Sequence, residues 1–366
     1  MQIAELKKSP ILEGYVYSYE EAVAYRDKGQ ILTIRLETSR VCNLKCKYCC
    51  NRSGQALENE ISYDKIKGLV LEAKELGAKS IIVIGGGEPT IYPHFKDLIS
   101  YIHNNGMVPV IFTNTQTITK ELARFLYENN VSVITKIDSL DGKIQDEMVG
   151  VKGAHKKIQI GLKNLFEVGY GNPKQDGSLK LGASFVVNRE NYKDVTNIWR
   201  YCRSHKMFPN LEMMIPNGNA KNIKDELISA AEWGVLKEEL LHIDQNEFGY
   251  TWFPYTPLIG VSCFQVMYNL YITVLGDVRP CSSIHCSSYN IKEHTLKDII
   301  NLPFFQLARN IEKNLTGKCK NCDKHSLCIG CRGLAFACNK DLKTEFESLC
   351  AEDPSCAYIG GLDETI

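Results

Sequence analysis

Apolar positions in the first two thirds of the chain form two alternating patterns. Short continuous runs, such as ILTIRLE at 31–37 and SIIVI at 80–84, are typical of strands buried in a parallel sheet. Between them, apolar residues recur at helical spacing, as they do after Ser62, a good N-cap, and before Gly77, a good helix terminator. The pattern predicts strands at 31–37, 80–84, 108–114, 131–137, 181–187 and 211–215, and helices at 62–77, 93–104, 119–128, 154–168 and 192–204.

Strands that alternate with helices imply parallel βαβ units, so the fold class is α/β. The alternation stops after Pro216. A charged helical segment at 224–241 follows, and YNLYITVLGDVRP predicts a β-hairpin with Gly276 and Asp277 in its turn. We expect four parts: an N-terminal extension at 1–30, an α/β domain at 31–216, a bridge at 217–255, and a small cysteine-rich domain with a hairpin and short helices at 256–366.

Charge and hydropathy narrow the class of protein. Lys plus Arg and Asp plus Glu both number 43, and this balance argues against a nucleic-acid partner. The first residues contain no long apolar segment typical of a secretory signal, and no apolar run reaches the roughly 18 residues of a membrane span. We therefore expect a cytoplasmic protein with no membrane partner.

Cysteine is the unusual component. The 15 cysteines include four at 42–50 and ten at 263–356, with only Cys202 between them. Without a secretory signal, a disulfide framework is not expected, and two tight clusters predict two metal regions.

The first cluster is Cys42-x3-Cys46-x2-Cys49. Three thiolates on one loop can ligate three irons of a 4Fe–4S cube and leave the fourth iron open, which suits a catalytic centre. Cys50 adjoins Cys49, so we expect its side chain to point away. One βα unit later, GGGEPT at 85–90 ends the second strand, where glycines allow close approach of a ligand.

This cysteine motif, with Tyr48 before its last cysteine and GGGEPT downstream, resembles the radical S-adenosylmethionine (SAM) superfamily over residues 31–216. The resemblance implies a partial (β/α)6 barrel with the cluster at the carboxyl ends of the strands. It also implies reductive cleavage of SAM to methionine and a 5′-deoxyadenosyl radical.

The resemblance also implies the SAM contacts. The glycine motif contacts the methionine moiety of SAM, and Glu88 faces its ammonium group. Residues at the ends of later strands reach the ribose and the carboxylate of SAM. For these strand-end residues, ordinary capping of turns is the alternative. Lys136 is expected to face the barrel or its rim. The expected SAM-binding residues are Gly85, Gly86, Gly87, Glu88, Pro89, Thr113, Asn114, Asp138, Ser139 and Asn188.

The second cysteine region contains Cys319-x2-Cys322-x5-Cys328-x2-Cys331, which in isolation would suggest structural zinc. With Cys263, Gly276, Cys281 and a final cysteine, the order resembles the SPASM extension, which holds two auxiliary 4Fe–4S clusters. The resemblance has one spacing departure, since the family has three residues before the counterpart of Cys331. It assigns Cys263, Cys281 and Cys331 to an inner cluster, and Cys319, Cys322, Cys328 and Cys350 to an outer one.

The fourth inner ligand stays open between Cys286 and substrate, and Cys286 is also our candidate hydrogen-atom donor. The roles of Cys50, Cys202, Cys338 and Cys356 stay open as well. Sulfatase maturases, which are similar, carry an acid after the second cysteine, where this chain has Ser282. That departure counts against formylglycine formation.

The resemblance implies an enzyme whose radical abstracts hydrogen and leads to oxidation, epimerisation or elimination. Only 41 residues precede Cys42, too few for the leader-binding domain of peptide-modifying members, so we expect a small polar metabolite as substrate, carbohydrate-type in our first hypothesis. The electron donor would be a flavodoxin or ferredoxin. A peptide- or protein-modifying maturase is the alternative. Two further alternatives involve no radical chemistry: a zinc-binding interaction protein and a ferredoxin-like electron carrier.

Overall fold

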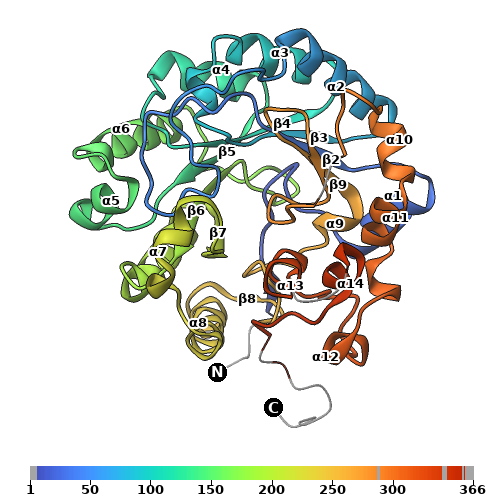
Figure 1. The fold of residues 1–366 in the computed structure, drawn as a ribbon. Helices are drawn as coiled ribbons and strands as arrows, with labels where there is room; N and C mark the ends of the chain where they lie inside the picture. Colours follow the sequence, from blue (N-terminus) through green and yellow to red (C-terminus); the bar gives the residue numbers. More distant parts are fainter. Residues whose placement is uncertain (1–5, 287–288, 340–343, 357, 359–366) are drawn as a thin grey trace.

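The dominant feature of the computed structural model is a curled, mostly parallel sheet ringed by helices (Figure 1). The structure describes residues 6–286, 289–339, 344–356 and 358. The strand order is β10-β9-β2-β3-β4-β5-β6-β7, and every pair except β9–β10 is parallel. The strands span β2 Thr33–Leu36, β3 Ser80–Val83, β4 Val108–Thr113, β5 Ser132–Lys136, β6 Leu181–Val187, β7 Phe208–Met213, β9 Asn269–Ile272 and β10 Val278–Arg279.

The helices between the barrel strands lie outside the ring of strands, and the C-terminal helices gather beside it (Figure 1). The barrel helices are α2 Tyr63–Glu75, α3 Phe95–Asn104, α4 Lys120–Glu128, α5 Gly142–Val149, α6 Ala154–Glu167 and α7 Val195–Ser204. The others are α1 Tyr19–Asp27, α8 Ala230–Ile243, α9 Gln265–Tyr268, α10 Leu296–Asn301, α11 Pro303–Arg309, α12 Gly317–Lys320, α13 Arg332–Cys338 and α14 Glu345–Cys350.

The predicted α/β barrel and its six parallel strands are confirmed. The Oγ of Ser62 caps α2 at the backbone N–H of Lys65, and Gly77 follows this helix with a φ of 86°. The hairpin is also confirmed, because β9 and β10 pair on either side of Gly276, whose φ is 89°. Helix α5 is additional to the predicted elements.

Strand β9 does more than form a hairpin. It pairs in parallel with β2, with Arg35 opposite Tyr271, and so extends the barrel beyond its six strands. A segment that we assigned to the C-terminal domain therefore belongs to the same sheet as the barrel. This pairing joins strands that lie more than 200 residues apart, which local patterns do not reveal.

Alternate residues of the strands face the inside of the barrel. One end of the interior is filled by a hydrophobic cluster that includes Ile82, Val110, Ile134 and Phe208, with Tyr15 of the N-terminal segment packed among them. The ring of Tyr15 meets those of Phe112 and Phe208 edge to face. This end is therefore packed, and the cavity described below lies at the carboxyl ends of the strands.

A buried charge cluster fastens the bridge region to the barrel. Asp244, which is 0% exposed, accepts hydrogen bonds from Arg203 on α7 at 2.6 and 2.9 Å. The indole N–H groups of Trp199 and Trp252 donate to the same carboxylate, each at 2.8 Å. Four donors around one buried acid compensate for its desolvation.

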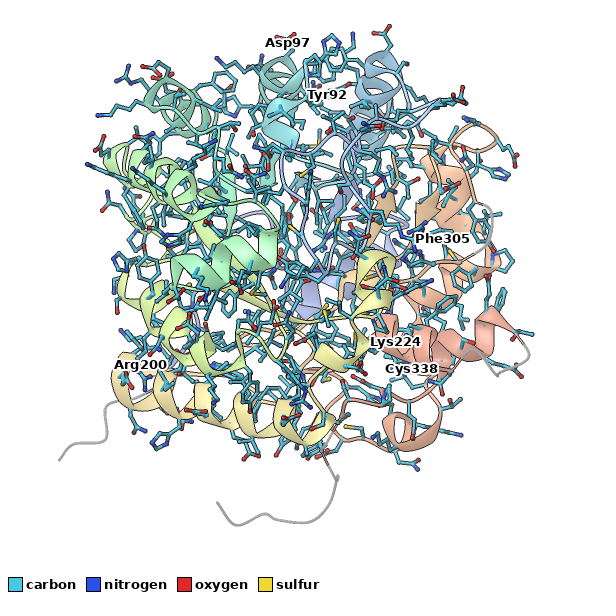
Figure 2. The ribbon with its side chains drawn as sticks, turned by 60° about the vertical axis from the view of Figure 1, so that its left-hand side comes forward. Tyr92, Asp97, Arg200, Lys224, Phe305 and Cys338 are labelled. Carbon is cyan, nitrogen blue, oxygen red and sulfur yellow. The ribbon has the colours of Figure 1, made fainter. Side chains whose placement is uncertain are left out.

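We expect Asp244→Ala to lower the free energy of unfolding by about 3–5 kcal/mol, because it leaves the buried Arg203 without its counter-ion. The matched control is Glu247→Ala, which removes the exposed partner of Arg200 on the outer surface (Figure 2) and should leave stability unchanged. Urea unfolding followed by circular dichroism measures both. Equal effects of the two substitutions would contradict the role of Asp244.

Candidate active site

A cavity of about 300 Å³ lies at the carboxyl ends of the barrel strands. Its lining brings together the three cysteines of the first cluster, the glycine motif and several strand ends. Among the predicted residues, those that line it are Cys42, Cys46, Cys49, Gly85, Gly86, Gly87, Glu88, Thr113, Asn114 and Lys136.

The loop of the first three cysteines, residues 38–54, crosses the mouth of the barrel. The backbone N–H groups of Lys45 and Lys47 donate to carbonyl groups near the end of α5, and Asn219, beyond β7, donates to the carbonyl of Cys49. The Sγ of Cys49 accepts the backbone N–H of Ser53 at 3.4 Å. The loop is therefore fixed at both sides of the barrel, which holds its three thiols toward the cavity.

Two glycines of GGGEPT make room for this loop. A Cβ on Gly87 would overlap the backbone carbonyl of Val41, and one on Gly86 would stand 2.6 Å from the carbonyl oxygen of Ser39. Gly86 also has a φ of 38°. The glycines are thus required by the close approach of the cysteine loop, in addition to the approach of a ligand that we expected.

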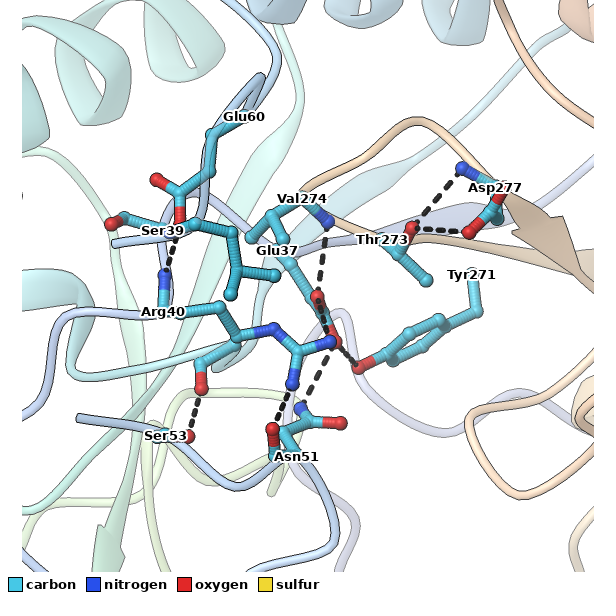
Figure 3. Close-up of polar contacts among 12 residues, drawn as sticks. Glu37, Ser39, Arg40, Asn51, Ser53, Glu60, Tyr271, Thr273, Val274 and Asp277 are labelled. Atoms are coloured by element: carbon cyan, nitrogen blue, oxygen red, sulfur yellow. Dashed lines mark hydrogen bonds and ion pairs between the residues drawn. The ribbon is translucent and has the colours of Figure 1, made fainter. Parts of the chain in front are cut away.

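A buried carboxylate ties the loop to the hairpin, as Figure 3 shows. Glu37, at the end of β2, accepts hydrogen bonds from the phenol of Tyr271 at 2.5 Å and the amide of Asn51 at 2.9 Å. The backbone N–H of Val274 donates to its second oxygen at 3.0 Å, and Arg40 lies 3.5 Å from that oxygen. One acid thus joins the cysteine loop, β2 and β9.

Glu88 is held by donors from the short 3₁₀ helix that follows it, Pro89–Ile91, and from the end of β4. Its Oε1 accepts from the hydroxyls of Thr90 and Thr113 at 2.5 and 2.6 Å, and its Oε2 accepts the backbone N–H of Asn114 at 2.7 Å. Burial raises its pKa, and these hydrogen bonds oppose that effect. Oε2 has only this one protein donor among the described residues, which leaves it able to accept from a ligand ammonium.

A second buried acid orients the tyrosine of the cysteine motif. Asp138 accepts from the phenol of Tyr48 and, at 2.7 Å, from the ammonium of Lys136. The ammonium lies 4.8 Å from the centre of the Tyr48 ring. Lys136 faces the cavity, as expected, but Asp138 itself lies behind it.

Four predicted SAM contacts do not line the cavity: Pro89, Asp138, Ser139 and Asn188. Pro89 begins a short 3₁₀ helix. The hydroxyl of Ser139 donates to Asp194 at 2.7 Å, and the amide oxygen of Asn188 accepts from the backbone N–H of Glu190 at 3.0 Å. The turn-capping alternative therefore describes Ser139, whose hydroxyl also accepts the backbone N–H of Asp141, and Asn188. The part of all four residues in SAM binding stays a prediction.

The cavity also contains residues that the sequence pattern did not identify. Cys50 lines it, contrary to our expectation that its side chain points away. Strand periodicity could have identified Arg35, Ser184, Glu212 and Tyr271, because they occupy inward-facing strand positions once the register is known. Ser282 and Ser283, which follow Cys281 outside the strands, also line the cavity.

The donor set fits an iron–sulfur cluster with one open iron. Burial raises the pKa of Cys42 to about 11 and that of Cys46 to about 12, so these thiols need a bound metal to become thiolates near neutral pH. In the part of the chain that the structure describes, no three His, Cys, Asp or Glu side chains are grouped as ligands of one metal ion. The three thiols instead surround one cavity, and a cluster there would supply the electron that cleaves SAM.

The expected inner cysteines lie near one another. Cys263 interacts electrostatically with Cys281, and Cys331 interacts with both. The Sγ of Cys331 accepts the backbone N–H of Leu334 at 3.4 Å. Cys286 instead has Glu345, Arg279 and Asp277 as its charged neighbours and does not line the active-site cavity, so nothing in the geometry supports it as a hydrogen-atom donor.

The outer cysteines surround a second cavity of about 350 Å³. Cys319, Cys322 and Cys328 line it, as predicted, but the fourth thiol is that of Cys356. Cys350 lies in α14 and packs into the hydrophobic core. Its helix therefore directs it away from this cavity, whereas Cys356 follows a turn in which its N–H donates to the carbonyl of Asp353.

A barrel with a three-cysteine loop and a glycine–glutamate motif at its strand ends defines a class of iron–sulfur enzyme. The model of the radical SAM superfamily matches residues 36–207, and that of the SPASM iron–sulfur cluster-binding domain matches residues 263–323. Together they cover more than half of the chain. The chain belongs to the radical SAM superfamily, is an enzyme, and carries a SPASM domain for auxiliary clusters.

Relatives that extend over most of the chain include the following two. An AdoMet-dependent heme synthase of Nitratidesulfovibrio vulgaris is 26% identical and covers 89% of this chain and 92% of its own length. The mycofactocin maturase MftC of Mycobacterium ulcerans is 25% identical, with 80% of each chain covered.

A solved structure with a similar fold is SuiB of Streptococcus suis bound to S-adenosylmethionine, with a TM-score of 0.67, 20% identity, and coverage of 93% of this chain and 81% of SuiB.

No helix among the described residues is both long and apolar enough to cross a membrane.

We expect Gly87→Ala to prevent assembly of the radical SAM cluster, because the new methyl group collides with backbone atoms of the cysteine loop, which cannot rotate away. Gly54→Ala is the control within the same loop, since open space surrounds that position. Iron analysis should show a loss of about four irons per chain in Gly87→Ala only. Full iron content in this variant would contradict the packing argument.

The second cavity yields a separate prediction. Cys356→Ala should lose the iron of the outer cluster, whereas Cys350→Ala should keep it, because only the former thiol faces the outer cavity. Iron and sulfide analysis with Mössbauer spectroscopy separates the two cases. The reverse result would restore Cys350 as the outer ligand.

Proposed function

We propose that this radical SAM enzyme catalyses a two-electron oxidation of a small polar metabolite. One observation carries the proposal: a single cavity extends from the first cysteine loop to Ser282 and Ser283, which directly follow the inner-cluster residue Cys281. A substrate in this cavity lies between the site where the radical forms and an electron acceptor.

The electron balance follows from that placement. One electron from a flavodoxin or ferredoxin cleaves SAM, and the adenosyl radical takes a hydrogen atom from the substrate to give 5′-deoxyadenosine. The substrate radical would then give up one proton and one electron as a second bond forms at the reacting carbon. An auxiliary cluster held by Cys263, Cys281 and Cys331 would supply the acceptor for that electron, with the same class of carrier as its final destination.

Glu212 is positioned to take the proton. It lies on the inner face of β7 and lines the cavity. Its Oε1 accepts a hydrogen bond from Asn210 at 2.9 Å, and none of the ion pairs among the described residues includes it. An unpaired carboxylate open to the cavity is available as a base.

The relatives bear on the substrate class. The AdoMet-dependent heme synthase, which matches over 89% of this chain and 92% of its own length, is named for a small molecule and supports that substrate class. None of the relatives reported above is named for a carbohydrate, so we do not retain that part of our hypothesis. A maturase acting on a peptide or protein is the second candidate, and the similarity to mycofactocin maturase favours it.

The reconstituted enzyme should form 5′-deoxyadenosine and methionine from SAM when reduced with dithionite. The variant with Cys42, Cys46 and Cys49 all changed to Ala should form neither, because no open iron remains, while it keeps its auxiliary iron. Cys338→Ser, at the exposed end of α13, is the control. Chromatography of the products checks this, and SAM cleavage by the triple variant would refute the assignment.

Cell extracts fractionated by size separate the two substrate classes. With a small-molecule fraction, the enzyme should release 5′-deoxyadenosine faster than without it, and deuterium from labelled metabolites should appear in that product. If only the macromolecular fraction increased the release of 5′-deoxyadenosine, the metabolite hypothesis would be wrong and a peptide or protein substrate would take its place.

A further inference from the structure

Arg35 is a buried cation at the centre of the proposed substrate site. It lies in the middle of β2, opposite Ile82 on one side and Tyr271 on the other. Its side chain faces the barrel interior and lines the cavity, yet the residue is only 4% exposed. An arginine in this position stays charged, because its guanidinium does not lose its proton in proteins.

This guanidinium lacks partners on one edge. In the part of the chain that the structure describes, Nε and Nη2 are buried and have no hydrogen-bond partner. The ion pairs among these residues do not include Arg35, although Tyr15 and Glu212 favour its charged form, and the ring of Tyr15 lies 5.2 Å from the guanidinium carbon. Two buried N–H donors without an acceptor are costly, so the position calls for a ligand.

The other arginines of similar burial are paired. Arg203 bonds Asp244 through Nε and Nη2. Arg309 donates to the carbonyl of Gln30, and Arg332 donates to the carbonyls of Leu349 and Ala351. Each of these three arginines has a protein acceptor, although Nη1 of Arg203 has none among the described residues. Arg35 differs because both Nε and Nη2 lack an acceptor there, in a residue that lines the cavity.

We propose that Arg35 binds a carboxylate of the substrate. Nε–H and Nη2–H lie in the guanidinium plane and point in the same direction along one edge. Their spacing matches the two oxygens of a carboxylate, which gives a bidentate, charge-assisted pair. The proposal rests on the oxidation proposed above and adds that the metabolite is an organic acid.

The surroundings favour a carboxylate over a phosphate. Glu212 is close enough to interact electrostatically with Arg35, and a dianion would be repelled by it more strongly than a monoanion. Ile84, Phe112 and Ile134 give the cavity apolar walls, which suit the hydrocarbon part of an organic acid.

Propionate and its neutral analogue propionamide serve as probes, with the oxidised, iron-loaded enzyme and SAM present and binding followed by ligand-observed NMR. Propionate should bind at least about tenfold more tightly than propionamide, and Arg35→Gln should remove that preference. Arg35→Lys should keep part of it, since the charge remains without the fork. Arg200→Gln, at an exposed ion pair, should change nothing.

Equal binding of the two probes to the wild-type enzyme would overturn the proposal, as would tighter binding of methylphosphonate than of propionate. If Arg35→Gln still preferred propionate and instead shifted the reduction potential of the auxiliary cluster, the proposal would also fail. The arginine would then act on the potential of that cluster and not on the substrate. Because probe binding needs no turnover, its failure is separate from a failure of SAM cleavage, which tests the proposed function itself.

Discussion

The buried carboxylate of Glu37 is the interaction on which the arrangement of this molecule depends. It is 0% exposed and receives a phenol from β9, an amide from the cysteine loop and a backbone N–H from the hairpin turn. A buried charge is tolerated only when several donors satisfy it, so its partners are held in one geometry. The radical-generating loop and the first strand of the auxiliary-cluster region are thereby held on one framework.

That framework explains how one cavity serves two redox sites. The glycines of GGGEPT let the cysteine loop lie directly on the end of β3, and Glu88 links the ends of β3 and β4 below it. On the other side, pairing of β9 with β2 carries the hairpin of the inner cysteines to the same rim. The end of the barrel around Tyr15 is packed with apolar side chains, so we expect substrate and SAM to share the cavity at the carboxyl ends of the strands. Charged side chains of the strands, such as Arg35 and Glu212, line that cavity.

Local patterns in the sequence predicted much of this fold, because each barrel strand and helix has its own periodicity and caps, as Ser62 and Gly77 show for α2. The motif cysteines and the glycine motif were also found, since their chemistry depends on short spacing. Pairings over long distances were not, and the parallel contact of β9 with β2 is the main example. The placement of Cys356 at the outer cavity and the open edge of Arg35 depend on helix direction and strand register, which only the folded chain reveals.

The central claim is that an iron held by Cys42, Cys46 and Cys49 is open and binds SAM inside the shared cavity. Electron paramagnetic resonance of the dithionite-reduced enzyme, recorded before and after addition of SAM, tests it most directly. SAM should change the signal of one cluster and leave those of the auxiliary clusters unaltered, because SAM binds at the iron that Cys42, Cys46 and Cys49 leave open. An iron-loaded enzyme whose spectrum does not respond to SAM would contradict it.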